Sequence, residues 1–221
     1  MELLHTAHVP AGDGPFPTIL LLHGWGASAH DLLGLAPILH GGEALVLSPQ
    51  GPIAFEIAQG MLGFGWWPIT QTRELDPRAF DAARQLLREF LDEACKRYPV
   101  DRRKLVVIGF SQGGVMAYDL VLSDPARFAG LVALSSWLPD PIDAAIPTQD
   151  EHQNFPALVV HGTQDPMIPV ERAQESRKRL LARGMNVHYR ELEMQHEVSP
   201  DALRELVLWL EERVFQLIKL A

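Results

Sequence analysis

Short apolar runs alternate with longer segments of helical periodicity along the whole chain. The runs are rich in Val, Ile and Leu, whereas the segments between them repeat apolar residues at the spacing of one helix face. The runs predict strands at 2–9, 18–23, 44–48, 104–110, 130–135, 157–161 and 186–192, and the periodic segments predict helices near 29–39, 77–98, 112–123, 170–183 and 200–218. This alternation predicts an α/β fold with a mostly parallel sheet of about seven strands and helices on both faces.

Two of the predicted helices carry clear start signals. Asp76 precedes Pro77 and Ser199 precedes Pro200, so each helix has a capping side chain followed by proline at its first position. Two long connections, 48–75 and 136–156, show neither strand-like apolar runs nor helical periodicity. Connections of this length inside a compact domain are usually functional, so we expect both to shape a site.

Composition narrows the class of protein. The 221 residues are 47% hydrophobic and 21% charged, and they show no linker, which predicts one globular domain over 1–221. The net charge of −9 argues against a nucleic-acid surface. A single cysteine, Cys95, excludes an internal disulfide and a thiolate metal cluster. Because no basic leader and no apolar run of membrane-spanning length are present, we expect a cytoplasmic protein without an integral membrane segment.

A serine between glycines marks the first candidate for chemistry. In Gly109-Phe110-Ser111-Gln112-Gly113 the serine follows an apolar run and opens a helical pattern. A strand, a sharp turn and a helix in this order form a nucleophile elbow, which holds the serine hydroxyl above the sheet. Glycines on either side avoid the clashes that so tight a turn creates. The alternative interpretation is an ordinary serine at a helix start.

A nucleophilic serine needs a base, and the base needs a carboxylate to orient it. Asp165 follows the predicted strand 157–161, and His196 lies between the last strand and the last helix. Both therefore reach the sheet edge that carries Ser111, in the order serine, acid, histidine. Alone, each would be an ordinary turn or loop residue. His23, at the end of another strand, stays open as an alternative base.

The segment 20–32 follows the second strand and is expected to supply half of an oxyanion hole. The predicted donors are the backbone amides of Trp25 and Gln112. A rival interpretation treats Gly24 to Ala29 as a dinucleotide-binding fingerprint. That fingerprint requires an acidic residue at the end of the following strand, where this chain has Ser48-Pro49-Gln50.

An aromatic and glycine-rich stretch lies at 60–68, inside the first long connection. Loops at the carboxyl ends of parallel strands line ligand crevices, so Phe64, Trp66 and Trp67 are candidates for substrate binding. The alternative places the tryptophans in the core or at a contact between two copies of a possible homodimer. No lid-like helix is predicted, which favours a shallow, open site for small esters.

Four separated motifs together resemble the phospholipase/carboxylesterase family of α/β-hydrolases, which includes acyl-protein thioesterases. They are LLHGWGAS at 21–28, VDRRKLVVIGFSQGGVMA at 100–117, HGTQDPMIPV at 161–170 and QHEVSPDAL at 195–203. The resemblance implies an α/β-hydrolase fold and hydrolysis of esters or thioesters without metal or cofactor. It also implies a triad of Ser111, Asp165 and His196. Trp25 and Gln195 depart from the family pattern, where leucine and glycine are usual, as does WWPI at 66–69.

These observations leave three hypotheses for function. The first is a serine carboxylesterase acting on esters of short to medium acyl chains, with a small molecule as substrate. The second is an acyl-protein thioesterase or lysophospholipase that uses the same triad and differs in its groove. The third, from another class, is a non-catalytic binding protein that keeps the fold.

Overall fold

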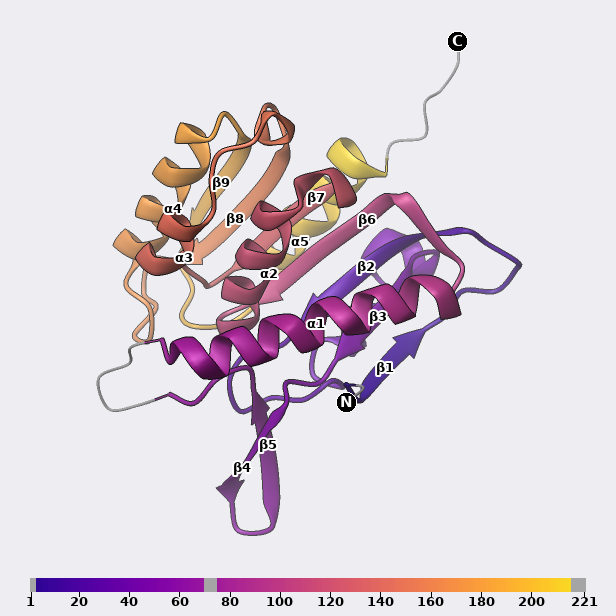
Figure 1. Cartoon of the computed structure of the whole chain (residues 1–221), viewed down its shortest axis with the longest axis horizontal. Helices are drawn as coiled ribbons and strands as arrows, with labels where there is room; N and C mark the ends of the chain where they lie inside the picture. Colours follow the sequence, from indigo (N-terminus) through magenta and orange to yellow (C-terminus); the bar gives the residue numbers. More distant parts are fainter. Residues whose placement is uncertain (1–2, 70–74, 216–221) are drawn as a thin grey trace.

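The computed structural model of the chain describes residues 3–69 and 75–215 and contains a seven-stranded sheet with helices against it (Figure 1). The strand order is β1-β3-β2-β6-β7-β8-β9, in which β1 is antiparallel and every other pairing is parallel. The strands are β1 His5–His8, β2 Phe16–Leu22, β3 Leu45–Pro49, β6 Val100–Phe110, β7 Gly130–Leu134, β8 Pro156–Gly162 and β9 Asn186–Leu192. All seven predicted strands are confirmed, although residue 2 lies outside the described range.

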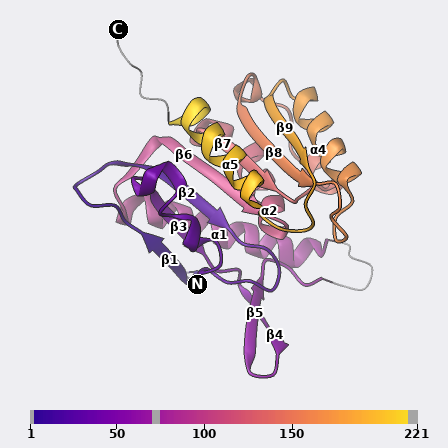
Figure 2. The ribbon, with the colours of Figure 1, turned by 180° about the vertical axis from the view of Figure 1, so that it is seen from behind.

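Helices cover both faces of this sheet, as Figures 1 and 2 show from opposite sides. They are α1 Pro77–Arg97, α2 Gln112–Ser123, α3 Asp140–Ala145, α4 Val170–Ala182 and α5 Pro200–Trp209. Buried residues of α1 to α4 belong to one apolar cluster, whereas those of α5 belong to the other. Among the described helices, none is long and apolar enough to cross a membrane.

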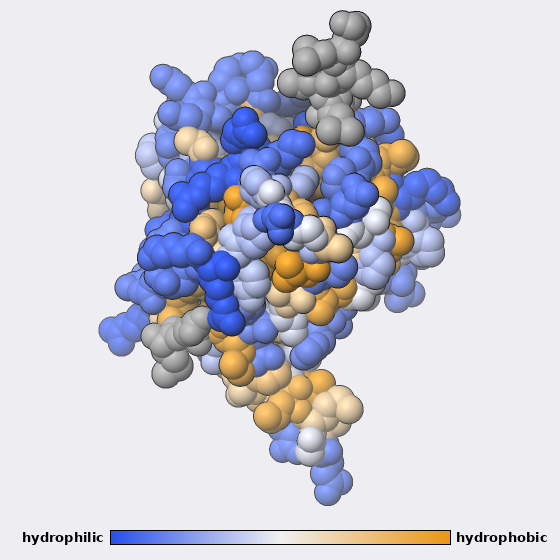
Figure 3. All heavy atoms as spheres, turned by 90° about the vertical axis from the view of Figure 1, so that its right-hand side faces the viewer, coloured by the Kyte–Doolittle hydropathy of each residue, from blue (hydrophilic) through white to orange (hydrophobic). Residues whose placement is uncertain are grey.

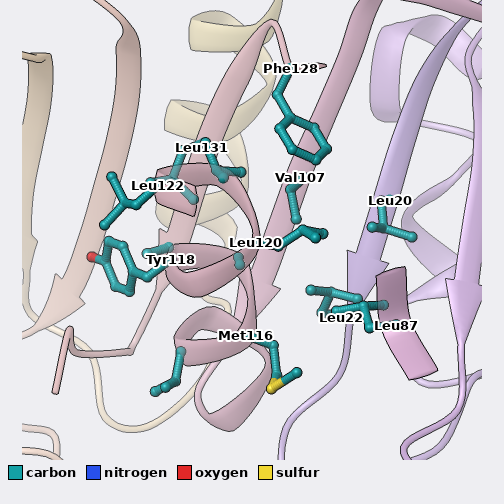
Figure 4. Close-up of a cluster of buried hydrophobic side chains, with 14 of the residues drawn as sticks. Leu20, Leu22, Leu87, Val107, Met116, Tyr118, Leu120, Leu122, Phe128 and Leu131 are labelled. Carbon is teal, nitrogen blue, oxygen red and sulfur yellow. The ribbon is translucent and has the colours of Figure 1, made fainter. Parts of the chain in front are cut away.

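Successive side chains of β2 belong alternately to the two apolar clusters. Leu20 and Leu22 pack with α1 and α2, while Ile19 and Leu21 face the side of α5, because successive strand residues point to opposite faces. Figure 4 shows the first cluster, in which side chains of α2 such as Met116 lie beside those of β2 and β6. The central strands are therefore buried on both faces, as continuous apolar runs predict.

The two predicted helix starts are confirmed. The side chain of Asp76 accepts hydrogen bonds from the amides of Arg78 and Ala79 at 3.0 and 3.1 Å, and Ser199 caps α5 through the amide of Ala202 at 3.2 Å. Each cap satisfies amides that have no partner inside the helix.

Two predicted helices differ from the structure. The segment 29–39 forms no α-helix and instead contains short 3₁₀ turns, Leu33–Leu35 and Leu39–Gly42. Gly34 and Pro37 interrupt it, since both disfavour a helix interior. The helix predicted over 200–218 ends as α5 at Trp209 and continues as a π-helical stretch, Leu210–Val214. Residues 216–218 lie outside the described range.

Both long connections contain structure that the periodicity did not indicate. The first folds into an antiparallel hairpin, β4 Ile53–Ala58 and β5 Met61–Gly65, separate from the main sheet. The hairpin projects from the body of the molecule and carries exposed apolar side chains (Figures 1 and 3). The second connection contains the short helix α3. Residues 70–74 of the first connection are not described.

Candidate active site

Ser111 occupies a strained turn at the carboxyl end of β6. Its φ and ψ angles are 53° and −118°, a conformation that residues with a side chain rarely adopt. Its amide donates to the carbonyl of Leu134 at the end of β7 at 2.9 Å, and α2 begins at the next residue. The sequence therefore folds here as the strand, turn and helix that were predicted.

The glycines around Ser111 are required by close backbone contacts. A Cβ atom on Gly109 would collide with the carbonyl oxygen of Gly113, and one on Gly113 would collide with the carbonyl oxygen of Leu22. A Cβ atom on Gly114 would meet the hydroxyl of Ser136. The turn thus packs directly against β2 and against the segment that follows β7, which leaves no room for larger residues.

Three side chains from different strand ends form one hydrogen-bonded chain. Nε2 of His196 lies 2.9 Å from Oγ of Ser111, and Nδ1 of His196 lies 2.7 Å from Oδ2 of Asp165. The other carboxylate oxygen accepts from the amides of Met167 and Ile168 at 2.8 and 2.9 Å. The Asp165 side chain is 0% exposed and that of His196 is 19% exposed. The histidine therefore reaches solvent, while its carboxylate partner is fixed in the interior.

Backbone hydrogen bonds beyond the strand ends bring the three loops together. The amide of Ser135 donates to Val160 of β8 at 2.9 Å, and the amide of Thr163 donates to Leu192 of β9 at 2.8 Å. The sheet ladder is thereby continued into the loops, so each loop is placed against its neighbour. This continuation explains why residues far apart in sequence meet at one edge of the sheet.

The two predicted oxyanion donors are the amide of Trp25 in the segment after β2 and the amide of Gln112 at the first residue of α2. Neither amide donates to another residue within the described ranges. The side chain of Gln112 is buried, and it accepts from the amide of Trp66 and donates to the carbonyl of Trp67, both at 2.8 Å. These bonds fix the first residue of α2 against the segment that follows the hairpin.

The dinucleotide-binding interpretation lacks its structural context. A pyrophosphate site of this kind needs an α-helix that begins directly after the glycines. The segment after Gly24–Ala29 forms turns and short 3₁₀ stretches instead. The carboxyl end of β3 also lacks the acidic residue, as the sequence indicated.

His23 is buried and fully hydrogen-bonded away from the serine. Its Nδ1 donates to the carbonyl of Gly24 at 2.7 Å, and its Nε2 accepts from the amide of Gly51 at 2.9 Å. Burial lowers the pKa of this imidazole, which keeps it neutral. The ring therefore links two loops, and the structure gives no support to His23 as the base.

The neutral His23 predicts a loss of stability in acid. An unfolded histidine takes up a proton as pH falls below its reference pKa of about 6.5, whereas the folded one does so only at lower pH. The free energy of unfolding should be constant above that pH and then fall by up to ~1.4 kcal/mol per pH unit for each such histidine. Urea unfolding of the parent and of His23→Gln between pH 5 and 8 measures this slope.

The matched control for this prediction is His30→Gln, because His30 is exposed. We expect the parent slope in His30→Gln and a shallower slope in His23→Gln. Equal slopes in the parent and in His23→Gln would contradict the neutral, buried state of His23.

The two tryptophans of the aromatic stretch belong to the core. Trp66 is 0% exposed and Trp67 is 3% exposed, and both pack in the cluster beneath α1. Nε1 of Trp66 donates to the carbonyl of His23 at 2.9 Å. Buried rings offer no surface to a ligand, so the structure favours the packing alternative for this pair and not the groove.

We predict that Trp66→Ala lowers stability without altering substrate preference. Loss of a buried tryptophan costs about 3–5 kcal/mol, because it leaves a cavity and, here, an unpaired carbonyl on His23. Urea unfolding measures the loss, with Leu62→Ala on the exposed hairpin as a control expected within ~0.5 kcal/mol of the parent. Parent-like stability together with a changed preference for acyl-chain length would instead indicate that Trp66 contacts the substrate.

Phe64 differs from the tryptophans because it is half-buried at the base of the hairpin. Its carbonyl accepts from the amide of Gly26 at 2.9 Å and its amide donates to the carbonyl of Ala27 at 2.8 Å. Next to this junction the rings of Trp25 and Phe55 stack with centroids 3.9 Å apart. The hairpin is thus fastened to the segment that carries the Trp25 amide.

Two further residues contact Ser111 or Trp25 and were not predicted from the sequence. The hydroxyl of Ser136 donates to the carbonyl of Ser111 at 2.7 Å, and Phe55 stacks on Trp25. Ser136 follows the strand 130–135, so a polar residue at a carboxyl strand end was an available signal. Phe55 had no such signal, because the hairpin itself was not predicted.

In the described part of the chain, no group of three or more His, Cys, Asp or Glu side chains could hold a metal ion.

Comparison with known proteins agrees with this architecture. The chain is 27% identical to acyl-protein thioesterase 1 of Gibberella zeae over 225 residues, which cover 93% of this chain and 94% of that protein. It is 27% identical to acyl-protein thioesterase 1 of Cryptococcus neoformans over 217 residues, which cover 88% of this chain and 91% of that protein. The crystal structure of the Bacillus cereus carboxylesterase superposes with a TM-score of 0.82 at 26% identity, covering 96% of this chain and 94% of that one.

The family model for phospholipases and carboxylesterases matches residues 5–213. The match includes the serine turn after β6 and the loops after β8 and β9. The α/β-hydrolase fold expected from the sequence is shared with the solved carboxylesterase. The chain therefore belongs to the phospholipase/carboxylesterase family, a family of hydrolases.

Proposed function

We propose that this chain is a serine esterase that hydrolyses carboxylic esters of short to medium acyl chains. The observation that carries the proposal is the hydrogen-bonded chain from Ser111 through His196 to the buried Asp165. A serine, a base and an orienting carboxylate in contact are what nucleophilic attack on a carbonyl requires.

In the first half of the proposed reaction, Oγ of Ser111 attacks the ester carbonyl carbon while Nε2 of His196 takes the hydroxyl proton. The tetrahedral intermediate collapses as the bond to the leaving alcohol breaks, and His196 gives the proton to that alcohol. In the second half, Nε2 of His196 takes a proton from the water that attacks the acyl carbon, the bond between that carbon and Oγ breaks, and His196 returns the proton to Ser111 as the acid product leaves. Asp165 holds the imidazole so that Nε2 faces the serine.

The charge that develops on the carbonyl oxygen needs donors that are already in place. The amides of Trp25 and Gln112 suit this role, because neither donates to another residue in the described ranges. Gln112 is the first residue of α2, where the helix dipole also favours negative charge. No metal or cofactor enters this scheme.

The substrate class follows from the surroundings of the serine. The apolar surface that adjoins the Trp25 amide is the stacked pair Trp25 and Phe55, with Phe64 at the hairpin base. We propose that this surface accepts the first few carbons of an acyl chain.

A thioesterase acting on acylated proteins is the second candidate. Two relatives that match along nearly their whole length are named acyl-protein thioesterases. The hairpin that is bonded to the Trp25 segment also exposes Ile57, Met61 and Leu62, which could contact a longer lipid. Such an enzyme would use the same three residues, so the substrate profile must distinguish the two.

The test compares aryl esters and the matching thioesters from acetyl to palmitoyl. Each methylene that enters the apolar surface adds at most ~0.8 kcal/mol, or about fourfold in kcat/KM, so the ester profile should rise over a few carbons and then level or fall. Phe64→Ala should flatten the rise, while Leu208→Ala on the outer side of α5 should not. A steady rise to palmitoyl with thioesters preferred would favour the second candidate.

Labelling by an organophosphonate ester separates both enzymes from a binding protein. The reagent should attach to the peptide that contains Ser111, as located by mass spectrometry. An unlabelled protein without hydrolysis of any ester or thioester would support the non-catalytic alternative.

A further inference from the structure

Another buried histidine lies close to the acid of the proposed triad. His161, in β8, is 0% exposed, and its Nε2 lies 2.8 Å from the carbonyl oxygen of Ile168. The same Nε2 lies 3.5 Å from Oδ2 of Asp165, the oxygen that accepts from His196. Two imidazole rings therefore approach the same carboxylate oxygen.

The ring also fastens both ends of the loop that carries the acid. His161 precedes this loop, and its Nε2 reaches the carbonyl of Ile168 at the far end. The amide of Ile168 in turn donates to Oδ1 of Asp165 at 2.9 Å. Ile168 is thus bonded to the His161 ring through its carbonyl and to the carboxylate through its amide. A displacement of the ring would therefore displace the acid.

The protonation of His161 follows from its partners. A carbonyl oxygen only accepts, so Nε2 must carry the hydrogen. Burial lowers the pKa of this imidazole, and a positive charge on His196 would lower it further. The negative charges of Asp165 and Glu191 raise the pKa, but burial has the larger effect. The ring is therefore neutral, and its one N–H donates to Ile168 while Nε2 lies 3.5 Å from Oδ2 of Asp165.

Packing alone does not account for a histidine at this position. Nδ1 of His161 is buried and has no hydrogen-bond partner within the described ranges. An unsatisfied buried polar atom costs about 1–3 kcal/mol, a cost that an apolar side chain of similar size would avoid. The N–H on the opposite side of the ring is the feature that an apolar side chain would lack.

We propose that His161 is a positioning residue, which holds the Asp165 loop through Ile168 so that one carboxylate oxygen stays directed at Nδ1 of His196. The inference rests on the proposed function, because it assigns His161 a role through the triad. The partial positive charge of the Nε2–H group, 3.5 Å from Oδ2, also offsets part of the negative charge of the carboxylate. Without it, the carboxylate would attract the proton on His196 more strongly, and the base would stay protonated to higher pH.

The test compares His161→Phe with His161→Gln. Phenylalanine keeps the bulk and removes the donor, whereas the glutamine amide can place an N–H near the position of Nε2. In His161→Phe we expect kcat to fall about tenfold with KM unchanged. We also expect the acidic limb of kcat/KM against pH to move to higher pH by about half a unit. His161→Gln should recover most of both effects, and His188→Gln on β9 should match the parent.

Two outcomes would overturn the inference. One is a folded His161→Phe with the parent kcat and the parent pH profile, whatever its melting temperature. The other is a phenylalanine-like loss in His161→Gln. If His161→Phe does not fold, His161→Asn takes its place in the test. Its shorter amide cannot reach the position of Nε2, so this variant should show the shifted pH profile. Asp165→Asn measured alongside keeps the two proposals apart, since its full activity would contradict the triad itself.

Discussion

Replacing Ser111 by alanine should reduce ester hydrolysis by roughly 10⁵–10⁶-fold in kcat. Only Oγ is lost, and with it the atom that forms the acyl-enzyme bond and gives its proton to Nε2 of His196, 2.9 Å away. The remaining donors and the binding surface would still favour the transition state over bulk water, by about 10³–10⁴-fold in comparable enzymes. Purified parent and variant are compared with an aryl ester at saturating concentration, and with the organophosphonate label, which should no longer attach.

The strained backbone of Ser111 supplies a control that separates chemistry from folding. Alanine must adopt the same φ of 53° as serine, so Ser111→Ala should unfold at about the parent urea concentration. Ser111→Gly should be equally inactive but more stable by about 1 kcal/mol, because glycine adopts positive φ without strain. Residual activity above a hundredth of the parent in either variant would contradict the role of Ser111 as nucleophile.

The main sheet was predictable because its strands are buried on both faces. A strand that is buried on both faces appears in the sequence as a continuous apolar run, as at 104–110 and 157–161. The capping residues before Pro77 and Pro200 mark the starts of two helices directly. The hairpin Ile53–Gly65 was missed because it lies largely outside the core. Its exposed apolar residues show no alternation, and its glycines suggested a loop.

The candidate site was predictable where chemistry and chain order coincide. Ser111, Asp165 and His196 each follow or adjoin a strand end, so the parallel topology alone brings them to one edge. Residues that act through packing or backbone bonds gave no such signal. Trp66 was a candidate for substrate binding because of its position in a loop, with the core as the alternative, and the choice needed its burial and its indole N–H bond to His23, which only the three-dimensional structure gives.

Replacing Asp165 by asparagine should lower kcat by up to ~10⁴-fold while leaving the fold intact. The amide oxygen can keep the bonds from Met167 and Ile168, which leaves the amide N–H facing His196. A donor at that place requires an unprotonated Nδ1, so the hydrogen moves to Nε2, and a neutral Nε2–H cannot accept the proton of the serine.

The experiment measures kcat for Asp165→Asn beside Asp13→Asn, an exposed aspartate for which we expect parent activity. Urea unfolding of both variants checks that any loss is chemical, and labelling of Asp165→Asn by the organophosphonate should be slowed in proportion to kcat. Because the carboxylate is 0% exposed and bonded on both oxygens, no other acid can replace it without moving the loop. Activity of Asp165→Asn within tenfold of the parent would therefore mean that His196 does not depend on this carboxylate for its orientation.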